Sequence, residues 1–339
     1  MTLGVIEMTR QILLQIIAES KLFKHWHWFQ HHFRLTLRGF PHPLAESVIT
    51  ACLACETKSK GFAKTTIDRL AAIGGRERHL PDWEQLLQQL AELHVVSRVL
   101  TWNWPVETTF AVEPNGEDSK KNPEVVISLQ HLRIGFEVKA PSLFAHVGNR
   151  GKNPTQIASR FAPKTVIETL AKPEAGITMP RDNPVKDYLV SAEAKFEPFL
   201  RNDPNFYGIL VIVWDDFIYE PISSLLQTDS GLFTENSFFR DKKGNAVRFP
   251  SIAGVVVIRH LHQLFRACRD EPLIDGCKYP LDFGHEGQFP WKAFIQNPFG
   301  LNVPKEAIDV LDARPHTDEM GAEYRPQEFI MWMNVPTKV

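Results

Sequence analysis

The sequence predicts an α/β protein, in which helices cover a sheet and a helical N-terminal region precedes it. The most hydrophobic run, Phe206–Trp214, is continuous and rich in β-branched residues, as is typical of a strand buried on both faces. Asp82–Leu100 repeats its apolar residues at helical spacing. Between these two segments, Val125–Leu129 and Arg133–Lys139 carry strand patterns. Helices that alternate with buried strands indicate the α/β class.

The first 80 residues show only helical patterns. Leu44–Glu56 and Thr65–Ile73 are predicted helices, and the second ends at Gly74. A lysine-bearing turn joins them, so two interpretations stay open: a helix-turn-helix that enters a nucleic-acid groove, or a helical bundle with solvated lysines. We therefore expect residues 1–80 to form a helical domain, for which binding of nucleic acid or of a partner protein is one of the two open interpretations.

The segment Lys21–Arg34 holds four histidines and five aromatic residues. A metal site or a base-stacking surface is one interpretation. The other is an amphipathic helix that packs Trp26, Phe29 and Phe33 into the core with histidines at its rim. We favour the packing interpretation, because the sequence fixes no partner ligands for these histidines.

Composition indicates a globular protein. With 43% hydrophobic residues and a net charge of −2, neither a disordered chain nor a basic nucleic-acid coat is expected. The chain has no apolar run of roughly 18 residues and no signal-peptide pattern at its start, so we expect a cytoplasmic protein without a membrane span. Its four cysteines do not make a disulfide framework. Cys52 and Cys55, on one predicted helix, are interpreted as buried thiols rather than as a zinc pair.

The two central strand patterns place charged groups in an apolar setting. Glu137 and Lys139 are two residues apart and share one face of a strand, while Phe136 and Val138 share the other. Glu124 starts the preceding strand, where it can lie beside Glu137. An exposed cross-strand ion pair is one explanation of this arrangement. The acidic block that contains it, residues 81–141, is flanked in the sequence by basic segments, as a metal site beside a phosphate path requires.

Pro123-Glu124, a short gap and Glu137-Val138-Lys139 resemble the motif of the PD-(D/E)XK nuclease superfamily. The predicted helix Asp82–Leu100, the strand Glu107–Glu113 and the two strands above follow the order of its core. The resemblance implies a restriction-endonuclease-like mixed sheet flanked by helices over residues 81–270, with an irregular extension, residues 271–339, packed on it. Glu124 stands where Asp is usual, which leaves other acids open as the first metal ligand: Glu113, Glu117 and Asp118.

The resemblance also implies a chemistry. Glu124 and Glu137 would hold Mg²⁺, with Mn²⁺ as a substitute, and Lys139 would orient or deprotonate the attacking water. The reaction would be hydrolysis of phosphodiester bonds in nucleic acid, with DNA expected as the substrate. A glycine-rich basic loop, residues 148–154, and a helix starting at Thr155 would contact phosphates. The residues expected to bind nucleic acid there are Arg150, Lys152, Gln156 and Arg160.

Further acids have a less specific setting. Glu84 and Glu92 on the predicted helix are candidates to complete a metal shell, but on so polar a helix a solvated glutamate is the favoured interpretation. Asp215 and Asp216 follow the buried strand and are interpreted as a strand-end turn.

Two other function classes remain. The first is a nuclease-fold protein without catalysis, which would serve as a nucleic-acid-binding or assembly module. The presence of Glu124 where the motif usually has Asp favours this class. The second is an enzyme of another chemistry, but the sequence shows no Ser-His-Asp set, no Rossmann glycine pattern and no HExxH motif that would support it. As protein partners we expect a second copy of the chain or components of a defence system.

Overall fold

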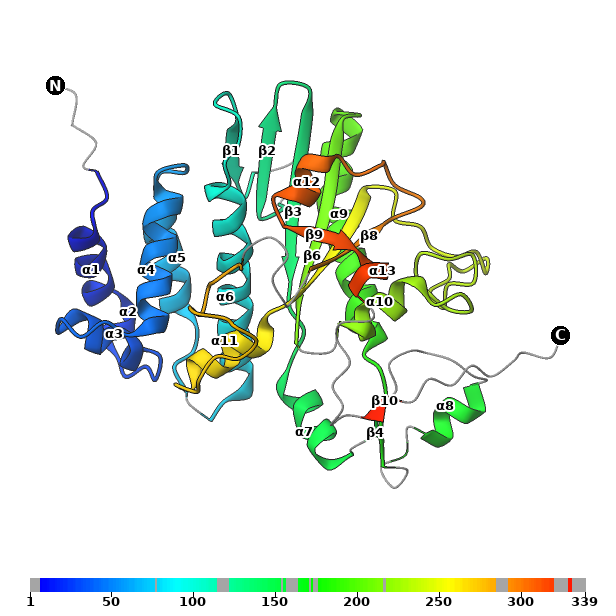
Figure 1. Cartoon of the computed structure of the whole chain (residues 1–339), viewed down its shortest axis with the longest axis horizontal. Helices are drawn as coiled ribbons and strands as arrows, with labels where there is room; N and C mark the ends of the chain where they lie inside the picture. The colour runs from blue at the N-terminus through cyan, green and yellow to red at the C-terminus, as the bar shows by residue number, and fades with distance from the viewer. Residues whose placement is uncertain are drawn as a thin grey trace.

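A seven-stranded mixed sheet forms the centre of the protein (Figure 1), in the order β1-β2-β3-β6-β7-β8-β9. The computed structural model describes residues 7–76, 78–114, 122–153, 155–156, 164–170, 172, 176–215, 218–284, 292–319 and 329–330. The predicted α/β class is thereby confirmed. The strands of the sheet are β1 (Thr109–Val112), β2 (Val125–Leu129), β3 (Leu132–Lys139), β6 (Phe206–Trp214), β7 (Ile252–Arg259), β8 (Lys292–Gln296) and β9 (Ala313–Pro315).

The sheet combines an antiparallel half with a parallel centre. β1, β2 and β3 pair antiparallel in chain order. β6 then pairs parallel to β3, and β7 parallel to β6. A parallel pair cannot be joined by a tight turn and needs a long crossover. Helix α9 (Asp182–Asn202) lies in the crossover from β3 to β6 and packs back onto both strands.

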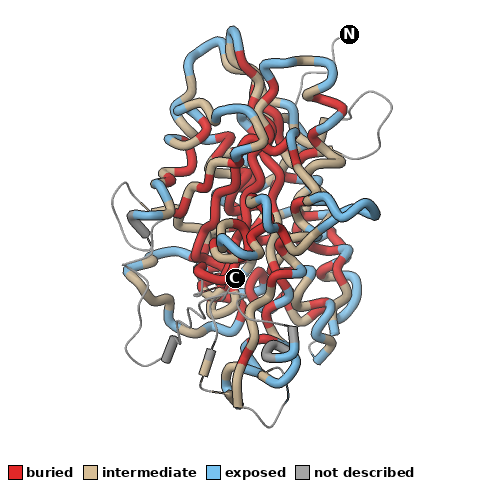
Figure 2. Tube along the Cα trace, turned by 90° about the vertical axis from the view of Figure 1, so that its right-hand side faces the viewer, coloured by how far each residue is buried: buried red, intermediate tan, exposed pale blue. Residues whose placement is uncertain are grey.

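Helices cover both faces of the sheet. In β6, Ile209 and Val211 belong to one apolar cluster, with helices α6 (Leu80–Thr101) and α11 (Leu261–Cys268). Leu210 and Ile212 belong to the other, with α9 and α10 (Tyr219–Leu226). Alternate strand residues thus feed two separate cores. Figure 2 shows the buried residues gathered in a central band. Among the described residues, no helix has the length and apolar character needed to cross a membrane.

The N-terminal helices extend the first of these cores. Leu13, near the start of the chain, and Val138 of the sheet belong to the same apolar cluster. The predicted helices over Leu44–Glu56 and Thr65–Ile73 are confirmed as α4 and α5, and Cys52 and Cys55 are buried as expected. The helices of this region are α1 (Arg10–Glu19), α2 (Lys21–Lys24), α3 (Gln30–Leu37), α4 (Pro43–Glu56) and α5 (Phe62–Ala72).

The histidine-rich segment differs in part from the prediction. Two short helices, α2 and α3, replace the single amphipathic helix. Phe29 and Phe33 are buried as predicted, but Trp26 is 66% exposed. His27 and His32 lie in the core rather than at its rim, because their ring nitrogens find backbone carbonyl partners there.

The C-terminal region also corrects the prediction. Residues 271–339 do not form only an irregular extension, since β8 and β9 complete the central sheet. β8 pairs antiparallel with β7 and parallel with β9. Their shortness, and the glycines, prolines and aromatics around them, hide the period-two pattern that identifies a strand. The short helices of this region are α12 (Lys305–Asp309) and α13 (His316–Glu319).

A small three-stranded sheet lies below the main one in Figure 1. Residues 148–152, predicted as a loop, instead belong to helix α7 (Phe144–Lys152). Thr155 does not start a helix, because β4 (Thr155–Gln156) pairs with β5 (Ile177–Thr178). The remaining elements are α8 (Lys164–Leu170) and β10 (Phe329–Ile330).

Candidate active site

Glu124 and Glu137 lie opposite each other on neighbouring strands. The antiparallel register of β2 and β3 pairs Val125 with Phe136. The backbone N–H of Glu124, one residue before this pair, donates to the Phe136 carbonyl at 2.9 Å. Glu124 is therefore the cross-strand neighbour of Glu137, and the two side chains project from the same face of the sheet.

Two lysines surround the carboxylate of Glu137, which is fully buried. Lys139 Nζ lies 2.7 Å from Glu137 Oε1. Lys195 Nζ, from α9, lies 2.6 Å from Oε1 and donates to Oε2 at 2.8 Å. The same ammonium is 3.5 Å from Glu124 Oε1, so Lys195 bridges the two carboxylates. A buried charge requires such partners, because its lost hydration is otherwise uncompensated.

Glycines on the sheet let α9 bring Lys195 this close. A Cβ on Gly208 would lie 2.4 Å from both the Ser251 carbonyl oxygen and Phe196 Cδ2 of α9. A Cβ on Gly135 would lie 2.4 Å from Phe206 Cζ and would crowd the same helix. The close packing places Lys195, one residue before Phe196, against the polar end of β3. The ion pairs raise the pKa of Lys195, although burial opposes its charge.

Glu92 adds a third carboxylate from α6. Burial raises its pKa to about 8, and repulsion from Glu124 adds to the effect. Burial also raises the pKa of Glu124 to about 7, with repulsion from Glu137 next in size. Glu92 is half-buried, so it is not the fully solvated glutamate that the sequence predicts. The raised pKa values of Glu92 and Glu124 reflect burial and the mutual repulsion of neighbouring carboxylates, and this is the electrostatic condition that favours a bound cation.

Glu92→Gln is expected to stabilise the protein at alkaline pH in the presence of a chelator. The folded-state pKa lies above the ordinary value of 4.5, so the folded state binds the proton more tightly. Stability therefore falls as pH rises from about 4.5 to about 8. Glutamine removes this loss, which is about 1.4 kcal/mol for each pKa unit before coupling to Glu124 reduces it. Urea unfolding at about pH 4 and about pH 9, on either side of that interval, measures the effect.

The matched control is Glu197→Gln, since Glu197 is 64% exposed on α9. The control should change stability little at either pH. Equal destabilisation of the Glu92→Gln protein at both pH values would mean that Glu92 supports the fold through contacts that do not depend on its charge, and would contradict this account.

The acidic groups fit a hard divalent cation. Mg²⁺ prefers oxygen ligands and commonly takes one or two carboxylates while it keeps several waters. Glu137 Oε1 is buried without hydrogen-bond geometry to any described group, although two ammoniums are close, so it retains acceptor capacity. Within the described part of the chain, these acids do not form a trio with ligand atoms all within 4.8 Å of one another. Two protein ligands, Glu124 and Glu137, are therefore the arrangement that the residues fit.

A pocket of about 480 Å³ opens beside Glu124, between α5 and α6. Arg69 and Glu113, on its wall, form an ion pair, so Glu113 is already engaged and is a weaker candidate for the first metal ligand. Glu117 and Asp118, which the sequence also left open for that role, lie outside the described residues. Amide side chains of α6 supply neutral hydrogen-bonding groups, and Gln89 donates to Glu92 Oε2 at 2.6 Å. The polar residues of the wall are Arg69, Gln85, Gln88, Gln89, Glu92, Glu113 and Glu124.

The structure describes two of the four residues predicted to bind nucleic acid in full, Arg150 and Lys152. Arg150 is half-buried and Lys152 exposed, both in the last turn of α7. This helix follows β3 directly in the chain and lies beyond its lower end in Figure 1. The side chain of Gln156 and the whole of Arg160 lie outside the described residues.

A buried ionic network stands at the end of β6. Arg181 donates to Asp215 Oδ2 at 2.8 Å and to Glu220 Oε2 at 2.6 Å. His146 Nε2 lies 3.2 Å from Glu220 Oε1, and Trp214 Nε1 donates to Oε2 at 3.2 Å. Burial disfavours the charge of Glu220, but Arg181 and His146 outweigh it and lower its pKa. Asp215 is thus engaged by an arginine, and Asp216 lies outside the described residues.

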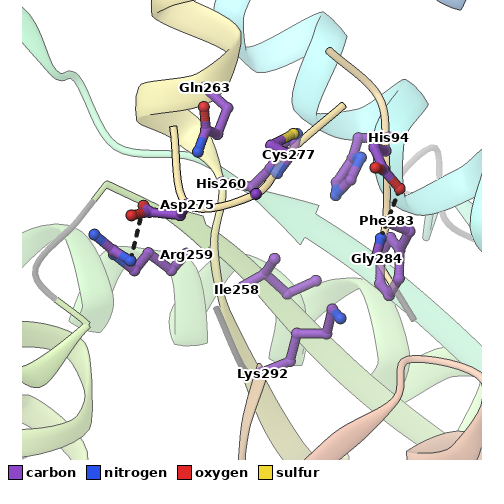
Figure 3. Close-up of a pocket in the computed structure, with 12 residues that line it drawn as sticks. His94, Ile258, Arg259, His260, Gln263, Asp275, Cys277, Phe283, Gly284 and Lys292 are labelled. Carbon is purple, nitrogen blue, oxygen red and sulfur yellow. Dashed lines mark hydrogen bonds and ion pairs between the residues drawn. The ribbon is translucent and has the colours of Figure 1, made fainter. Parts of the chain in front are cut away.

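A small cavity lies near the end of β7 (Figure 3). Its volume is about 30 Å³, enough for a single water molecule. The rings of His94 and His260 stack beside it at 3.9 Å, and burial lowers the pKa of both. Lys292, also buried, pairs with Asp312 at 3.3 Å. We interpret this cavity as a hydrated part of the core.

The sequence did not identify Lys195 as a residue of the site, and it predicted Glu92 to be solvated. Lys195 lies 56 positions beyond Lys139 in the chain, and its neighbours on α9 follow an ordinary amphipathic pattern. A signal did exist, since a lysine among Ala192, Phe196 and Phe199 lies close to the buried stripe of the helix.

Comparisons of the chain with protein-family models, curated proteins and solved structures found no match.

Proposed function

We propose that this protein is a metal-dependent nuclease that hydrolyses phosphodiester bonds, with DNA as its expected substrate. One observation carries the proposal. Glu124 faces Glu137 across neighbouring strands, and Lys139 lies 2.7 Å from Glu137 on the same face. Two acids and a lysine at one point are the set that the resemblance to PD-(D/E)XK nucleases implies.

Each residue would have a separate role. Glu124 and Glu137 would hold Mg²⁺ or Mn²⁺, which supplies charge to polarise a phosphoryl group and acidify water. The Lys139 ammonium, fixed by Glu137, would hold the water and stabilise negative charge that develops on phosphate oxygens. The pocket beside Glu124 would give the substrate access from solvent.

The order of elements supports this proposal. A long helix, α6, precedes three antiparallel strands, and α9 leads into the parallel strand β6. This is the order expected of a restriction-endonuclease-like core. Burial of Phe136 and Val138 toward α6 leaves Glu137 and Lys139 on the α9 face, where function rather than core packing accounts for them.

One observation favours the second candidate, a nucleic-acid-binding or assembly module without catalysis. Lys195 already bridges Glu124 and Glu137, so the acids are partly neutralised without a metal ion. Calorimetric titration with Mg²⁺ separates the two candidates. A nuclease should bind Mg²⁺ and lose that binding in Glu137→Gln. A protein that binds no Mg²⁺ but retains DNA in EDTA would be the module.

Arg150→Ala combined with Lys152→Ala is expected to weaken DNA binding and its dependence on salt. For each phosphate that is no longer neutralised, the slope of log affinity against log salt should become shallower by about 0.9. The binding is measured in Ca²⁺ or EDTA, which separates it from cleavage. Lys305→Ala, a change at a lysine that is 85% exposed on α12, is the control. An unchanged slope in the double variant would mean that α7 does not contact the phosphates of the bound DNA.

A further inference from the structure

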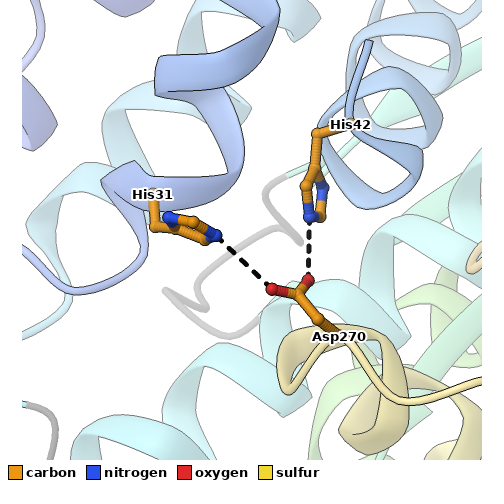
Figure 4. Close-up of side chains that lie close together, drawn as sticks. All are labelled: His31, His42 and Asp270. Carbon is orange, nitrogen blue, oxygen red and sulfur yellow. Dashed lines mark hydrogen bonds and ion pairs between the residues drawn. The ribbon is translucent and has the colours of Figure 1, made fainter. Parts of the chain in front are cut away.

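A cluster of two histidines and an aspartate lies where α3 and α4 meet the end of α11 (Figure 4). His31 is on α3, His42 is the N-cap of α4, and Asp270 follows α11. His31 Nε2 lies 3.4 Å from Asp270 Oδ2, and His42 Nε2 lies 2.8 Å from Oδ1. One ligand atom from each residue lies within 4.8 Å of the others.

We propose that His31, His42 and Asp270 bind a divalent transition-metal ion of the Zn²⁺ class. Imidazole nitrogens combined with a carboxylate suit Zn²⁺, whereas Mg²⁺ prefers oxygen ligands alone. Bonds of about 2.0–2.2 Å to a tetrahedral ion place ligand atoms roughly 3.3 Å apart. The ligand atoms now lie within 4.8 Å of one another, so a contraction of at most about 1.5 Å reaches that spacing. The site is separate from the carboxylates of the proposed nuclease centre and does not depend on them.

The backbone already fixes two of the ligands. His42 is buried, and its Nδ1 accepts from the N–H of Leu44 at 3.3 Å. Asp270 has a φ of 56°, a left-handed conformation that turns it back toward the histidines after the helix ends. Because Nδ1 of His42 accepts the hydrogen bond from Leu44, the proton of the neutral ring sits on Nε2 and points at Asp270. Metal binding at Nε2 moves this proton to Nδ1, so the ion replaces the direct contact between Nε2 and Asp270, and the long hydrogen bond from Leu44 is given up.

The cluster is also open enough to receive an ion. The side chains of His31 and Asp270 are 59% and 50% exposed, so an ion can enter and water can complete its coordination. His32 Nε2 is 3.9 Å from Asp270 Oδ1, but it faces the Cys268 carbonyl at 3.2 Å. We therefore assign His32 to the support of the cluster rather than to the ligands.

The three ligands come from distant parts of the chain. His31 and His42 belong to the N-terminal helices, while Asp270 follows a helix that packs on α6 and α4. An ion bound to all three would cross-link these layers and favour the folded state. The histidine-rich segment Lys21–Arg34 thus supplies one ligand, and the partner ligands that its sequence does not identify come from elsewhere.

Titration of untagged protein with Zn²⁺ tests the proposal, by calorimetry and by the shift in Tm. Visible absorption of bound Co²⁺ reports the coordination geometry. The variants are His31→Ala, at an exposed side chain, and Asp270→Asn, which tolerates the left-handed backbone. His25→Ala, at another exposed histidine of the segment, is the matched control.

We expect one Zn²⁺ per chain at this site, with a raised Tm. Affinity should fall by more than about tenfold in His31→Ala and in Asp270→Asn, since even outer partners of a metal site cause losses of that size. His25→Ala should bind Zn²⁺ as the wild type does, because this exposed histidine is not part of the cluster. Absence of Zn²⁺ binding by the wild type would overturn the proposal. So would equal binding by the wild type and both ligand variants.

Discussion

Lys139→Ala is expected to reduce the rate of phosphodiester cleavage by about a hundredfold or more, the usual effect of removing one preorganised charge from a reaction centre. The reason is the position of its ammonium, 2.7 Å from Glu137 and 15% exposed at the end of β3. It would lie beside both the attacking water and the phosphoryl oxygens. Single-turnover cleavage with saturating Mg²⁺ measures the effect.

The fold should survive this change. Lys139 contributes charge to the α9 face, while Phe136 and Val138 make the apolar contacts of β3 on the other face. Glu124 and Glu137, the proposed metal ligands, remain in the variant, so Mg²⁺ affinity should be largely kept. Lys305→Ala should cleave at the wild-type rate. Cleavage by Lys139→Ala at that same rate would place the chemistry elsewhere in the molecule.

Glu220→Ala is expected to destabilise the protein by about 3–5 kcal/mol, the range for breaking a buried ion pair. Glu220 is fully buried, and its carboxylate contacts Arg181, His146 and the Trp214 indole. Alanine removes all three interactions and leaves Arg181 with Asp215 to balance its charge. Urea unfolding at neutral pH measures the loss.

Glu197→Ala is the control for Glu220→Ala, because Glu197 is an exposed glutamate and should change stability by no more than about 0.5 kcal/mol. If Glu220→Ala proved as mild as the control, the network at the end of β6 would contribute little to folding. Its buried charges would then be retained for another purpose.

The sequence predicted the central strands well, for a definite reason. Phe206–Trp214 matches β6 residue for residue, since a continuous β-branched run is rarely anything but a buried strand. The face that Glu137 and Lys139 share followed from the two-residue period of a strand. The prediction that Glu124 lies beside Glu137 agrees with the register of β2 and β3. Their metal-binding role stays a prediction.

The parts that could not be predicted depend on tertiary contacts. Lys195 joins the site only because α9 packs closely over Gly208, and no local pattern records that contact. Glu92 is half-buried by neighbouring elements rather than by its own helix. β8 becomes a strand by pairing with β7, although its surroundings resemble a loop. Asp82 lies in the first turn of α6, where His79 Nδ1 is 2.8 Å from its carboxylate, a contact that helical periodicity does not reveal.

The most direct test of the central claim is cleavage of single- and double-stranded DNA and RNA by the wild-type protein and by Glu137→Gln. The two carboxylates are proposed to hold the metal that the reaction needs. The wild type should therefore cleave at least one of the four substrates in Mg²⁺ or Mn²⁺ and stop in EDTA. Glu137→Gln should be inactive under every condition. No cleavage of any substrate by the wild type, or undiminished cleavage by Glu137→Gln, would contradict the account.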